Sequence, residues 1–560
     1  MAGRKSRSRA GAGVFIGAAA AALLAFPGAA SAAVNSSVTN GDLVVSSTAG
    51  DPIAITSVEV NGVQQVKVNG QDPGNGAAQS AAIDSIVVTG DAGANSIDLS
   101  GVDNPPFTTL ASITVDGGGG NDTIIGSKLA DTLNGGGGND RITPDDNPQN
   151  TQDVARGDAG DDTMVWNGGD DNDVNVGGAD SDTTEVNGAA AGEEFTVKPS
   201  TAMPGFVRFD RLTDPPGPFN IEISGDTERL DLNANGGNDS ITADPGFASL
   251  KLDVEGGEGN DNLDGGDAAD LLSGGPGNDR LTGDDNPAFT QDVSLGDAGD
   301  DTMVWNPGDD DDINEGGPDN DTAEVNGGGK ERFEVARGAG DRVAFARVQP
   351  NSSFGAPFSV DIGTTENLRL NAGDGDDTIV GKQGLAGLIK STLNGDDGND
   401  SIKGTDGEDL LSGGKGFDLI RSRDNAADQV EGNGGFDVAF VDKRDTVRGV
   451  EIVLGGNLRV RHLGGKAITV AGNVAVVRLQ GVGTKLTTGR VHLLRGGKSL
   501  GTAKYKVTRK PKTVRIKLNK RGLRLIARAP RKGLSVKLRI DARDTNGNGW
   551  RTTDSIKLKR

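Results

Sequence analysis

The chain has 560 residues, with 89 glycines, 81 acidic residues and a formal net charge of −24, whereas aromatic residues make up only 4%. The glycines follow no strict Gly-x-y period, which excludes a collagen-like triple helix, and they are too many for an ordinary core. There is no cysteine, so disulfide bonds are excluded, and two histidines leave little acid–base machinery for catalysis.

The negative charge is confined to one part of the chain. Residues 455–560 contain 28 Lys and Arg against three Asp, a net charge of +25, whereas residues 34–454 carry −53. A segment this acidic would be disordered unless cations bind to it. Metal ions are therefore the expected stabilising element of a chain that has no disulfides.

Residues 1–32 are predicted to be a secretory signal peptide. They contain a charged start at 4–9, an apolar stretch at 14–26 and a small-residue cleavage site at 30–32. A membrane anchor is the alternative, but the apolar stretch is short and rich in alanine. We expect a secreted, extracellular protein with no transmembrane segment after signal cleavage.

From residue 33 to residue 454 the sequence repeats itself. We predict three units, 33–186, 187–325 and 326–454, because residues 133–188 match residues 272–327 at an offset of 139. Apolar residues alternate with a period of two, as at Phe195 and Val197, and a helical period is absent. Each unit is therefore expected to be an irregular β segment followed by a run of glycine-rich turns.

The turns carry the most specific signal in the chain. Within residues 116–143, three turns begin nine residues apart, at Gly117, Gly126 and Gly135, and the outer two read Gly-Gly-x-Gly-x-Asp-x-apolar. This triplet of turns recurs from residue 256 and from residue 395. Beyond each triplet the turns follow at a spacing of about ten residues, with an acid in the Asp position at Asp162, Asp182, Asp301, Asp321 and Asp437.

The residue types of these turns have a physical reason. Glycine permits positive φ in a tight turn, and Asp supplies a carboxylate. If two nonapeptides make one coil, aspartates 18 residues apart lie on one edge, ~4.8 Å apart. Two carboxylates at that distance repel by about 3–4 kcal/mol at an effective dielectric constant near 20. A ladder of them requires cations, and ligands that are all oxygen indicate a hard cation.

The nonapeptide resembles the hemolysin-type (RTX) calcium-binding repeats of bacterial secreted proteins. The resemblance implies an all-β fold in which a parallel β-roll or β-solenoid of three tandem RTX-like units binds several Ca²⁺ ions in GGxGxD turns. The residues expected to form the metal sites are Gly117, Gly118, Gly120, Asp122, Asp131, Gly135, Gly136, Gly138, Asp140, Asp162, Asp239, Gly256, Gly257, Gly259, Asp261, Gly265, Asp270, Gly274, Gly275, Gly277, Asp279, Asp301, Asp377, Gly395, Gly398, Asp400, Asp409, Gly413, Gly414, Gly416 and Asp418.

Residues 455–560 are predicted to form a separate domain. Alternating runs such as 514–518 and 536–540 indicate half-buried antiparallel strands, and one short helix is expected at 520–529. The pattern resembles the small immunoglobulin-like β-sandwiches at the ends of many bacterial surface proteins. Its basic surface is either merely solvated or attracts an anionic cell-wall polymer and holds the protein at the cell surface. Nucleic acid is not an expected partner of a secreted chain.

These features favour a structural or adhesive calcium-binding protein and not an enzyme. The alternative is a secreted hydrolase with catalytic residues in 38–110, 188–250 and 327–390 and RTX repeats as a folding scaffold. The triplicate β pattern of these segments suits a scaffold better than one active site. A G-x-S-x-G match at residues 497–501 lies in a basic hairpin without the strand–turn–helix context of a nucleophile. A third reading is a soluble calcium buffer.

Overall fold

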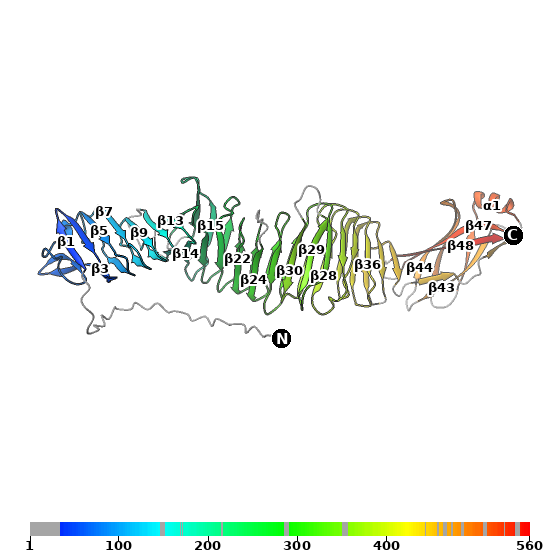
Figure 1. Ribbon diagram of the computed structural model, residues 1–560. Helices are drawn as coiled ribbons and strands as arrows, with labels where there is room; N and C mark the ends of the chain where they lie inside the picture. The colour runs from blue at the N-terminus through cyan, green and yellow to red at the C-terminus, as the bar shows by residue number, and fades with distance from the viewer. Residues whose placement is uncertain are drawn as a thin grey trace.

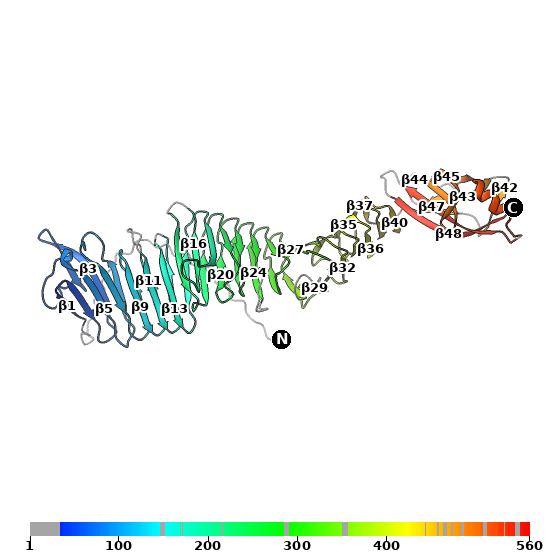
Figure 2. The same ribbon diagram turned by 90° about the horizontal axis from the view of Figure 1, so that it is seen from above.

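The structure, a computed structural model, describes residues 34–559 except for 146–151, 169, 171, 214–216, 285–290, 350–356, 443, 456–458, 463–466, 472–473, 483–486, 508–511, 531 and 544–548. The predicted signal peptide lies outside the described residues. The chain winds into a long solenoid of two sheets, with the N-terminal coils at one end and a separate C-terminal domain at the other (Figures 1 and 2).

The all-β solenoid fold is confirmed. Successive strands alternate between two sheets, A and B, and each pairs with the strand one coil away, mostly in parallel. In the nonapeptide region a coil contains 18 residues, so that Ile124 of one strand is the register partner of Ile142.

In spatial order along the solenoid, the described part of sheet A contains β1 (Asn35–Thr39), β2 (Asp42–Ser46), β5 (Ser85–Thr89), β7 (Ser112–Asp116), β9 (Asp131–Gly137), β11 (Asp153–Ala159), β13 (Asp173–Ala179), β17 (Phe219–Ser224), β16 (Phe206–Arg211), β15 (Glu194–Pro199), β19 (Ser240–Ala243), β21 (Asn262–Asp264), β23 (Arg280–Thr282), β25 (Thr302–Trp305), β27 (Thr322–Asn326), β31 (Asn367–Asn371), β33 (Lys390–Asn394), β35 (Leu410–Gly416), β37 (Gln429–Gly435) and β39 (Thr446–Arg448). Sheet B contains β4 (Val63–Val68), β3 (Ile53–Val60), β6 (Ser96–Gly101), β8 (Thr123–Ile125), β10 (Arg141–Thr143), β12 (Thr163–Trp166), β14 (Thr183–Asn187), β18 (Arg229–Asn233), β20 (Lys251–Glu255), β22 (Leu271–Pro276), β24 (Asp292–Ala298), β26 (Asp312–Glu315), β30 (Phe358–Gly363), β29 (Val343–Gln349), β28 (Arg332–Arg337), β32 (Thr378–Gly381), β34 (Ser401–Lys403), β36 (Leu419–Ser422), β38 (Val438–Val441) and β40 (Ile452–Gly455). A 3₁₀ turn, η1 (Ser80–Ala82), follows β4.

Two antiparallel meanders interrupt the parallel coils. Strands β15, β16 and β17 add two strands to sheet A, because β17 pairs with β13 and β15 pairs with β19. Strands β28, β29 and β30 do the same in sheet B, between β26 and β32. The predicted unit boundaries, 186/187 and 325/326, fall at the ends of β14 and β27, just ahead of the meanders.

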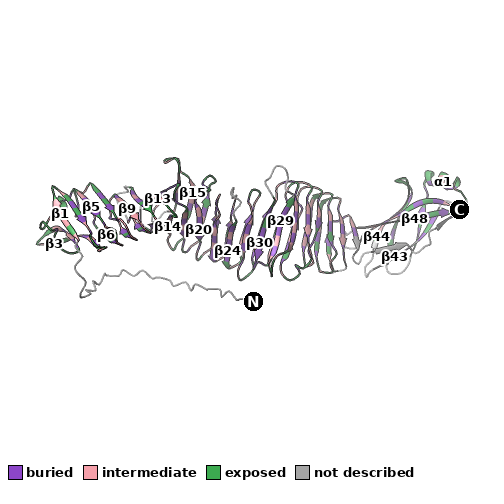
Figure 3. Cartoon of the chain, viewed as in Figure 1, coloured by how far each residue is buried: buried purple, intermediate pink, exposed green. Residues whose placement is uncertain are grey.

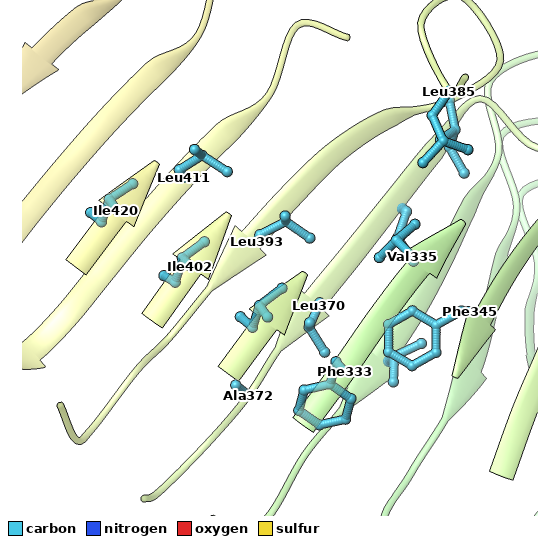
Figure 4. Packing of buried hydrophobic residues seen from close by; sticks show 14 of the residues in the cluster. Phe333, Val335, Phe345, Leu370, Ala372, Leu385, Leu393, Ile402, Leu411 and Ile420 are labelled. Atoms are coloured by element: carbon cyan, nitrogen blue, oxygen red, sulfur yellow. The ribbon is translucent and has the colours of Figure 1, made fainter. Parts of the chain in front are cut away.

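A thin hydrophobic core fills the space between the sheets. The shortest strands contribute one fully buried aliphatic side chain each, such as Ile124 and Ile142, and outward positions along the strands are more exposed (Figure 3). The meanders thicken this core with aromatic residues. Figure 4 shows Phe333 and Phe345 of the second meander beside the aliphatic stack that continues through Leu370, Leu393 and Leu411.

The C-terminal domain consists of a mainly antiparallel sheet. One group contains β41, β43 and β46, a second contains β45, β44, β47 and β48, and β42 joins them by pairing with both β43 and β48. Buried side chains of both groups, including Val477, Ile516 and Leu538, form one core. Its immunoglobulin-like character remains a prediction. The elements are β41 (Arg459–His462), β42 (Ala467–Ala471), β43 (Val474–Val482), β44 (Thr487–Arg495), β45 (Lys498–Val507), β46 (Lys512–Lys517), α1 (Lys520–Ala527), β47 (Leu534–Arg543) and β48 (Gly549–Lys559).

Helix α1 ends two residues earlier than its predicted limit. Its N-terminus is capped by Asn519, whose Oδ1 accepts a hydrogen bond from the Gly522 N–H at 2.9 Å. Among the described residues, no helix has the length and apolar character needed to cross a bilayer.

Candidate metal sites

The glycine-rich turns form three arrays along the edges of the solenoid. We call the edge where the chain passes from sheet A to sheet B the A-to-B edge, and the other the B-to-A edge. Arrays 1 and 3 lie on the A-to-B edge, and array 2 lies on the B-to-A edge. Their aspartates are Asp122, Asp140, Asp162 and Asp182 in array 1, Asp239, Asp261, Asp279, Asp301 and Asp321 in array 2, and Asp377, Asp400, Asp418 and Asp437 in array 3.

Within an array, each aspartate is tied to the next by one hydrogen bond. The Asp122 N–H donates to Asp140 Oδ1 at 2.7 Å, and the Asp140 N–H donates to Asp162 Oδ1 at 2.7 Å. The same link joins Asp261 to Asp279 at 2.8 Å in array 2. The predicted ladder of carboxylates, one per coil, is therefore present in the fold.

The second oxygen of each carboxylate has no such bond. Oδ2 of every array aspartate is buried and lacks a hydrogen-bond partner among the described residues. A Cβ built on Gly117 would lie 2.4 Å from Asp122 Oδ2 and 2.5 Å from the Gly135 carbonyl oxygen. The first glycine of the turn therefore leaves room where a carboxylate oxygen and a carbonyl oxygen of the next coil converge. An oxygen-lined space of this kind fits Ca²⁺, which takes mixed carboxylate and carbonyl ligands.

The second and fourth positions of the turns adopt positive φ. In the first turn of array 1, Gly118 and Gly120 both have φ of 95°. A Cβ on Gly118 would also lie 2.3 Å from the carbonyl oxygen of Asp91 in the preceding coil. Where these two positions are not glycine, they are Asp or Asn with positive φ, as at Asp158, Asp180, Asn235, Asp297, Asp319, Asp396 and Asn433.

Burial perturbs the array carboxylates strongly. Removal from water raises the pKa of Asp140 to about 6, of Asp162 to about 7 and of Asp377 to about 8, and the neighbouring carboxylates of the ladder add to the shift. Backbone N–H donors oppose it. Without a cation, these arrays hold charge that the fold disfavours.

Glutamates occupy the ends of the arrays. The last aspartates of arrays 1, 2 and 3 donate their N–H groups to Glu228, Glu366 and Glu451, respectively, at 2.8 to 3.0 Å. At the start of array 2, the Glu193 N–H donates to Asp239 Oδ1 at 2.6 Å, and array 3 starts with Glu331 in the same way at 2.7 Å.

A buried arginine from each meander neutralises the starting glutamate. Arg211 of β16 forms an ion pair with Glu193, and Arg347 of β29 donates from Nη1 to Glu331 Oε1 at 3.0 Å. All four side chains are at most 2% exposed. The Arg347 guanidinium also lies 4.8 Å from the centroid of the Phe358 ring. We call each acidic residue of a ladder a rung. At the first rung of arrays 2 and 3, the protein itself thus supplies the cation.

The remaining predicted aspartates lie on the edge opposite their array, as the spacing of nine residues requires. Two of them are fixed by hydroxyl residues of the same turn: Ser127 donates to Asp131, and Thr405 donates to Asp409 from both N and Oγ1. Asp270 instead accepts the Leu252 N–H at 2.7 Å. The Asp270 N–H donates to Asp292 Oδ1 at 2.7 Å. This is the same kind of hydrogen bond that joins successive aspartates within an array, but it lies on the edge opposite array 2. Burial raises the pKa of Asp270 to about 9.

Sequence patterns located the array turns but missed the glutamates at their ends. Glu193 and Glu331 follow a glycine by five and four residues, and a Cβ on Gly188 or Gly327 would lie 2.4 Å or 2.6 Å from the glutamate Oε2. A glutamate four or five residues after a glycine could therefore be used to predict the start of an array. Asp153, Asp292 and Asp428 on the opposite edges were also missed, because the turns before them lack the glycine pattern.

Comparison with protein families identifies these turns. A model described as the RTX calcium-binding nonapeptide repeat matches the chain in four copies, at residues 116–146, 255–286, 363–384 and 391–420. The chain carries RTX calcium-binding repeats. All four matched segments include turns of the three arrays. RTX nonapeptides bind Ca²⁺, and four copies indicate several ions per chain. No curated protein matches the chain at a significant level.

Proposed function

We propose that this RTX repeat protein is secreted and that its solenoid is a structural element that folds when Ca²⁺ binds the three arrays. The observation that supports the proposal is the buried Oδ2 atom, without a hydrogen-bond partner among the described residues, of every array aspartate. The array glycines and aspartates named above are the proposed ligands, through carboxylate and carbonyl oxygens. RTX repeat proteins are generally secreted, and the predicted signal peptide agrees with this.

Magnitudes support a dependence of folding on Ca²⁺. Neighbouring carboxylates repel by about 3–4 kcal/mol per pair. Sites of extracellular calcium proteins bind at about 10⁻⁴–10⁻³ M, and at ten times Kd each site adds roughly 1.4 kcal/mol to stability. Several sites together reach the stability of a typical domain, about 5–15 kcal/mol.

Circular dichroism of the full chain tests this proposal. At pH 8, where the array carboxylates are least protonated, we expect the β signal of the solenoid to be lost in excess chelator and restored by millimolar Ca²⁺, while the C-terminal domain keeps its own melting transition because it lacks the turns. Equal β content in chelator and in millimolar Ca²⁺ would refute calcium-driven folding.

The meanders favour a structural role over a hydrolase. They occupy much of 188–250 and 327–390, where the hydrolase alternative places catalytic residues. Most of their inward side chains are packed hydrophobic residues, and the buried Arg211 and Arg347 pair with Glu193 and Glu331. The two tryptophans that precede the meanders stack inside the core, Trp166 on Phe219 at 3.7 Å and Trp305 on Phe358 at 3.6 Å. Packing in the core accounts for both tryptophans.

A second proposed function is retention at the cell surface through the basic domain. A cavity of about 720 Å³ next to the last coil is lined by Arg490, Lys504, Arg539 and Arg551 around Asp541. Arg539 and Arg551 reach Asp541 at 3.2 Å and 2.7 Å, and Glu451 of the last coil also lines the cavity, so four cationic side chains face two carboxylates. The excess positive charge fits an anionic cell-wall polymer.

Cosedimentation with purified cell walls tests retention. Replacing Arg490 and Lys504 together with Gln should lower the bound fraction several-fold, because both charges line the cavity. Replacing Lys520 and Arg521 of α1 with Gln removes the same charge elsewhere in the domain and should have a smaller effect. Added salt should weaken binding steeply. Binding that is insensitive to salt and to the cavity variant would exclude this mode of retention.

A further inference from the structure

Three aspartates converge on the B-to-A edge opposite array 3. Asp409 precedes β35, and Asp424 and Asp428 lie in the turn that joins β36 to β37. One carboxylate oxygen from each lies within 4.8 Å of the other two. The family match ends at residue 420, and the turn 422–428, Ser-Arg-Asp-Asn-Ala-Ala-Asp, contains no glycine.

The geometry of the three carboxylates is built by the surrounding backbone. The Asp409 N–H donates to Asp428 Oδ1 at 3.0 Å, which positions Asp428, while Thr405 holds Asp409. Asp424 Oδ1 accepts the Ala426 N–H at 2.7 Å. Each carboxylate is thus oriented by a hydrogen bond from the local chain.

One oxygen of this cluster stays without a hydrogen bond. Asp428 is 1% exposed, and its Oδ2 has no hydrogen-bond partner among the described residues. A buried carboxylate oxygen beside two further carboxylates is unfavourable unless a cation is present. Burial, together with the charges of Asp424 and Asp409, raises the pKa of Asp428 to about 8.

One part of the arrangement, the backbone link between two aspartates, recurs in the other two units. The Asp131 N–H donates to Asp153 Oδ1 and the Asp270 N–H to Asp292 Oδ1, both at 2.7 Å. An additional aspartate, Asp145 or Asp284, follows the intervening strand there, as Asp424 follows β36. Among the described residues, only Asp409, Asp424 and Asp428 bring three carboxylates together.

We propose that Asp409, Asp424 and Asp428 form a calcium site of a second type, in which side-chain carboxylates replace the carbonyl oxygens of a glycine-rich turn. The ion would join the turns before β35 and β37 on the B-to-A edge, opposite array 3. Three carboxylates provide the all-oxygen, negatively charged ligand set that Ca²⁺ prefers. This site shares no ligand with the arrays. Loss of calcium binding at this site can therefore be measured separately from loss of calcium binding in the arrays.

Calcium counting on the full chain tests the site. Asp424→Asn and Asp428→Asn each keep the shape of the side chain and remove one ligand charge. We expect each variant to bind one ion fewer per chain in equilibrium dialysis with CaCl₂, or to weaken one site at least tenfold. Because both act on the same ion, the double variant should lose no more than one ion.

The control is Glu431→Gln. Glu431 lies on β37, three residues after Asp428, and its carboxylate is 36% exposed beside Arg448. This change removes the same charge from the same coil and should leave the ion count unchanged. Asp418→Asn in array 3, combined with Asp428→Asn, should lose two ions.

The outcomes separate this proposal from calcium-driven folding. Asp424 is only partly buried, so Asp424→Asn decides the matter if Asp428→Asn fails to fold. If Asp424→Asn binds as many ions as the unaltered chain, with unchanged affinities, the second site does not exist, whatever the arrays do. If Asp418→Asn loses an ion and Asp424→Asn does not, only the arrays bind.

Discussion

Aspartate and asparagine replace glycine in the array turns only where their backbone preference allows it. These two residues visit the left-handed region more readily than other non-glycine residues, because their short polar side chains bond locally. Asp180 has φ of 85° at the fourth position of the last turn of array 1. The turn therefore keeps its shape although the glycine signature is incomplete.

Asp180 offers a direct test of this backbone requirement. Asp180→Ala should destabilise array 1 in millimolar Ca²⁺ by part of the about 1–2 kcal/mol that this region costs an L-residue, because alanine keeps the Cβ but loses the polar side chain that bonds locally. Asp180→Gly should be neutral or stabilising, and Asp180→Asn controls for the lost charge. Urea midpoints measured by circular dichroism compare the three. Equal midpoints for the alanine and asparagine variants would show that φ is not what selects the residue.

The buried arginines make a second local prediction. Arg347→Met leaves Glu331 buried without its cation and should cost about 3–5 kcal/mol. The control Arg369→Met removes an arginine that is 54% exposed and pairs with Glu324, which should cost about 0–1 kcal/mol. Thermal melting in Ca²⁺ measures both changes.

Glu331→Gln added to Arg347→Met should recover part of the loss, because it removes the unpaired charge. If Arg347→Met melts like Arg369→Met, the pair is not the first rung of the array.

Single residues were predictable where the chemistry is local. The turn motif located the array aspartates, because glycine, carboxylate and apolar residue stand at fixed spacing within one turn. Arg211 and Arg347 could not be predicted. Each reaches its glutamate across a meander, 18 and 16 residues along the chain, and alternation within a strand does not reveal which inward position carries a charge.

Within each array, a hydrogen bond links each aspartate to the next. Asp261 and Asp279 share one hydrogen-bonded link at 2.8 Å, whereas Asp270 is linked to Asp292 on the other edge. Two aspartates on the same ladder should act on shared ions, and two on opposite edges should not.

Paired substitutions test the ladder. Asp261→Asn and Asp279→Asn should be non-additive in their effect on bound Ca²⁺, while Asp261→Asn with Asp270→Asn should be closer to additive. Asp231→Asn on β18, with a side chain that is 43% exposed, is the control and should lose no ion. Calorimetric titration measures all of them. If Asp231→Asn lost as much bound Ca²⁺ as the turn variants, the acidic segment would bind calcium only as diffuse counterions and not at defined sites.

The arrangement of the arrays was only partly predictable. The spacing of 18 residues placed Asp261 and Asp279 on one edge, and the structure confirms it. The change of edge from one array to the next was not foreseen. Each strand segment takes the chain from one edge to the other, so an odd number of segments between two turns places them on opposite edges. The number between Asp122 and Asp261 is odd when the meander is counted as one segment. Meander strands and coil strands have the same period of two, so the sequence does not distinguish them.

Along the full solenoid, the buried carboxylates couple stability to pH. Burial raises the pKa of Asp140 to about 6, of Asp239 to about 7 and of Asp428 to about 8, from an ordinary value of 3.8. The folded, metal-free chain therefore binds protons more tightly than the unfolded chain. The stability from these groups is fully present below about pH 4 and is lost as the pH rises through 6 to 8.

In chelator, the solenoid should thus melt at the highest temperature near pH 4 and at progressively lower temperatures towards pH 8. Millimolar Ca²⁺ should reverse the trend above pH 6, because the ion replaces the protons, and apparent calcium affinity should rise over the same range. Melting curves at several pH values, with and without Ca²⁺, measure this. A metal-free chain that gains stability from pH 4 to pH 8 would contradict the buried ladder.

The arginine at the first rung gives arrays 2 and 3 a starting point and a direction of growth. The meander brings its own cation and its own aromatic core, so this part of the fold can form before any ion arrives. From Glu331 onward, each rung's N–H orients the carboxylate of the following one, beginning with Asp377 and then Asp400. Assembly would then be a seeded process that runs towards the C-terminus, the order in which the chain leaves the ribosome.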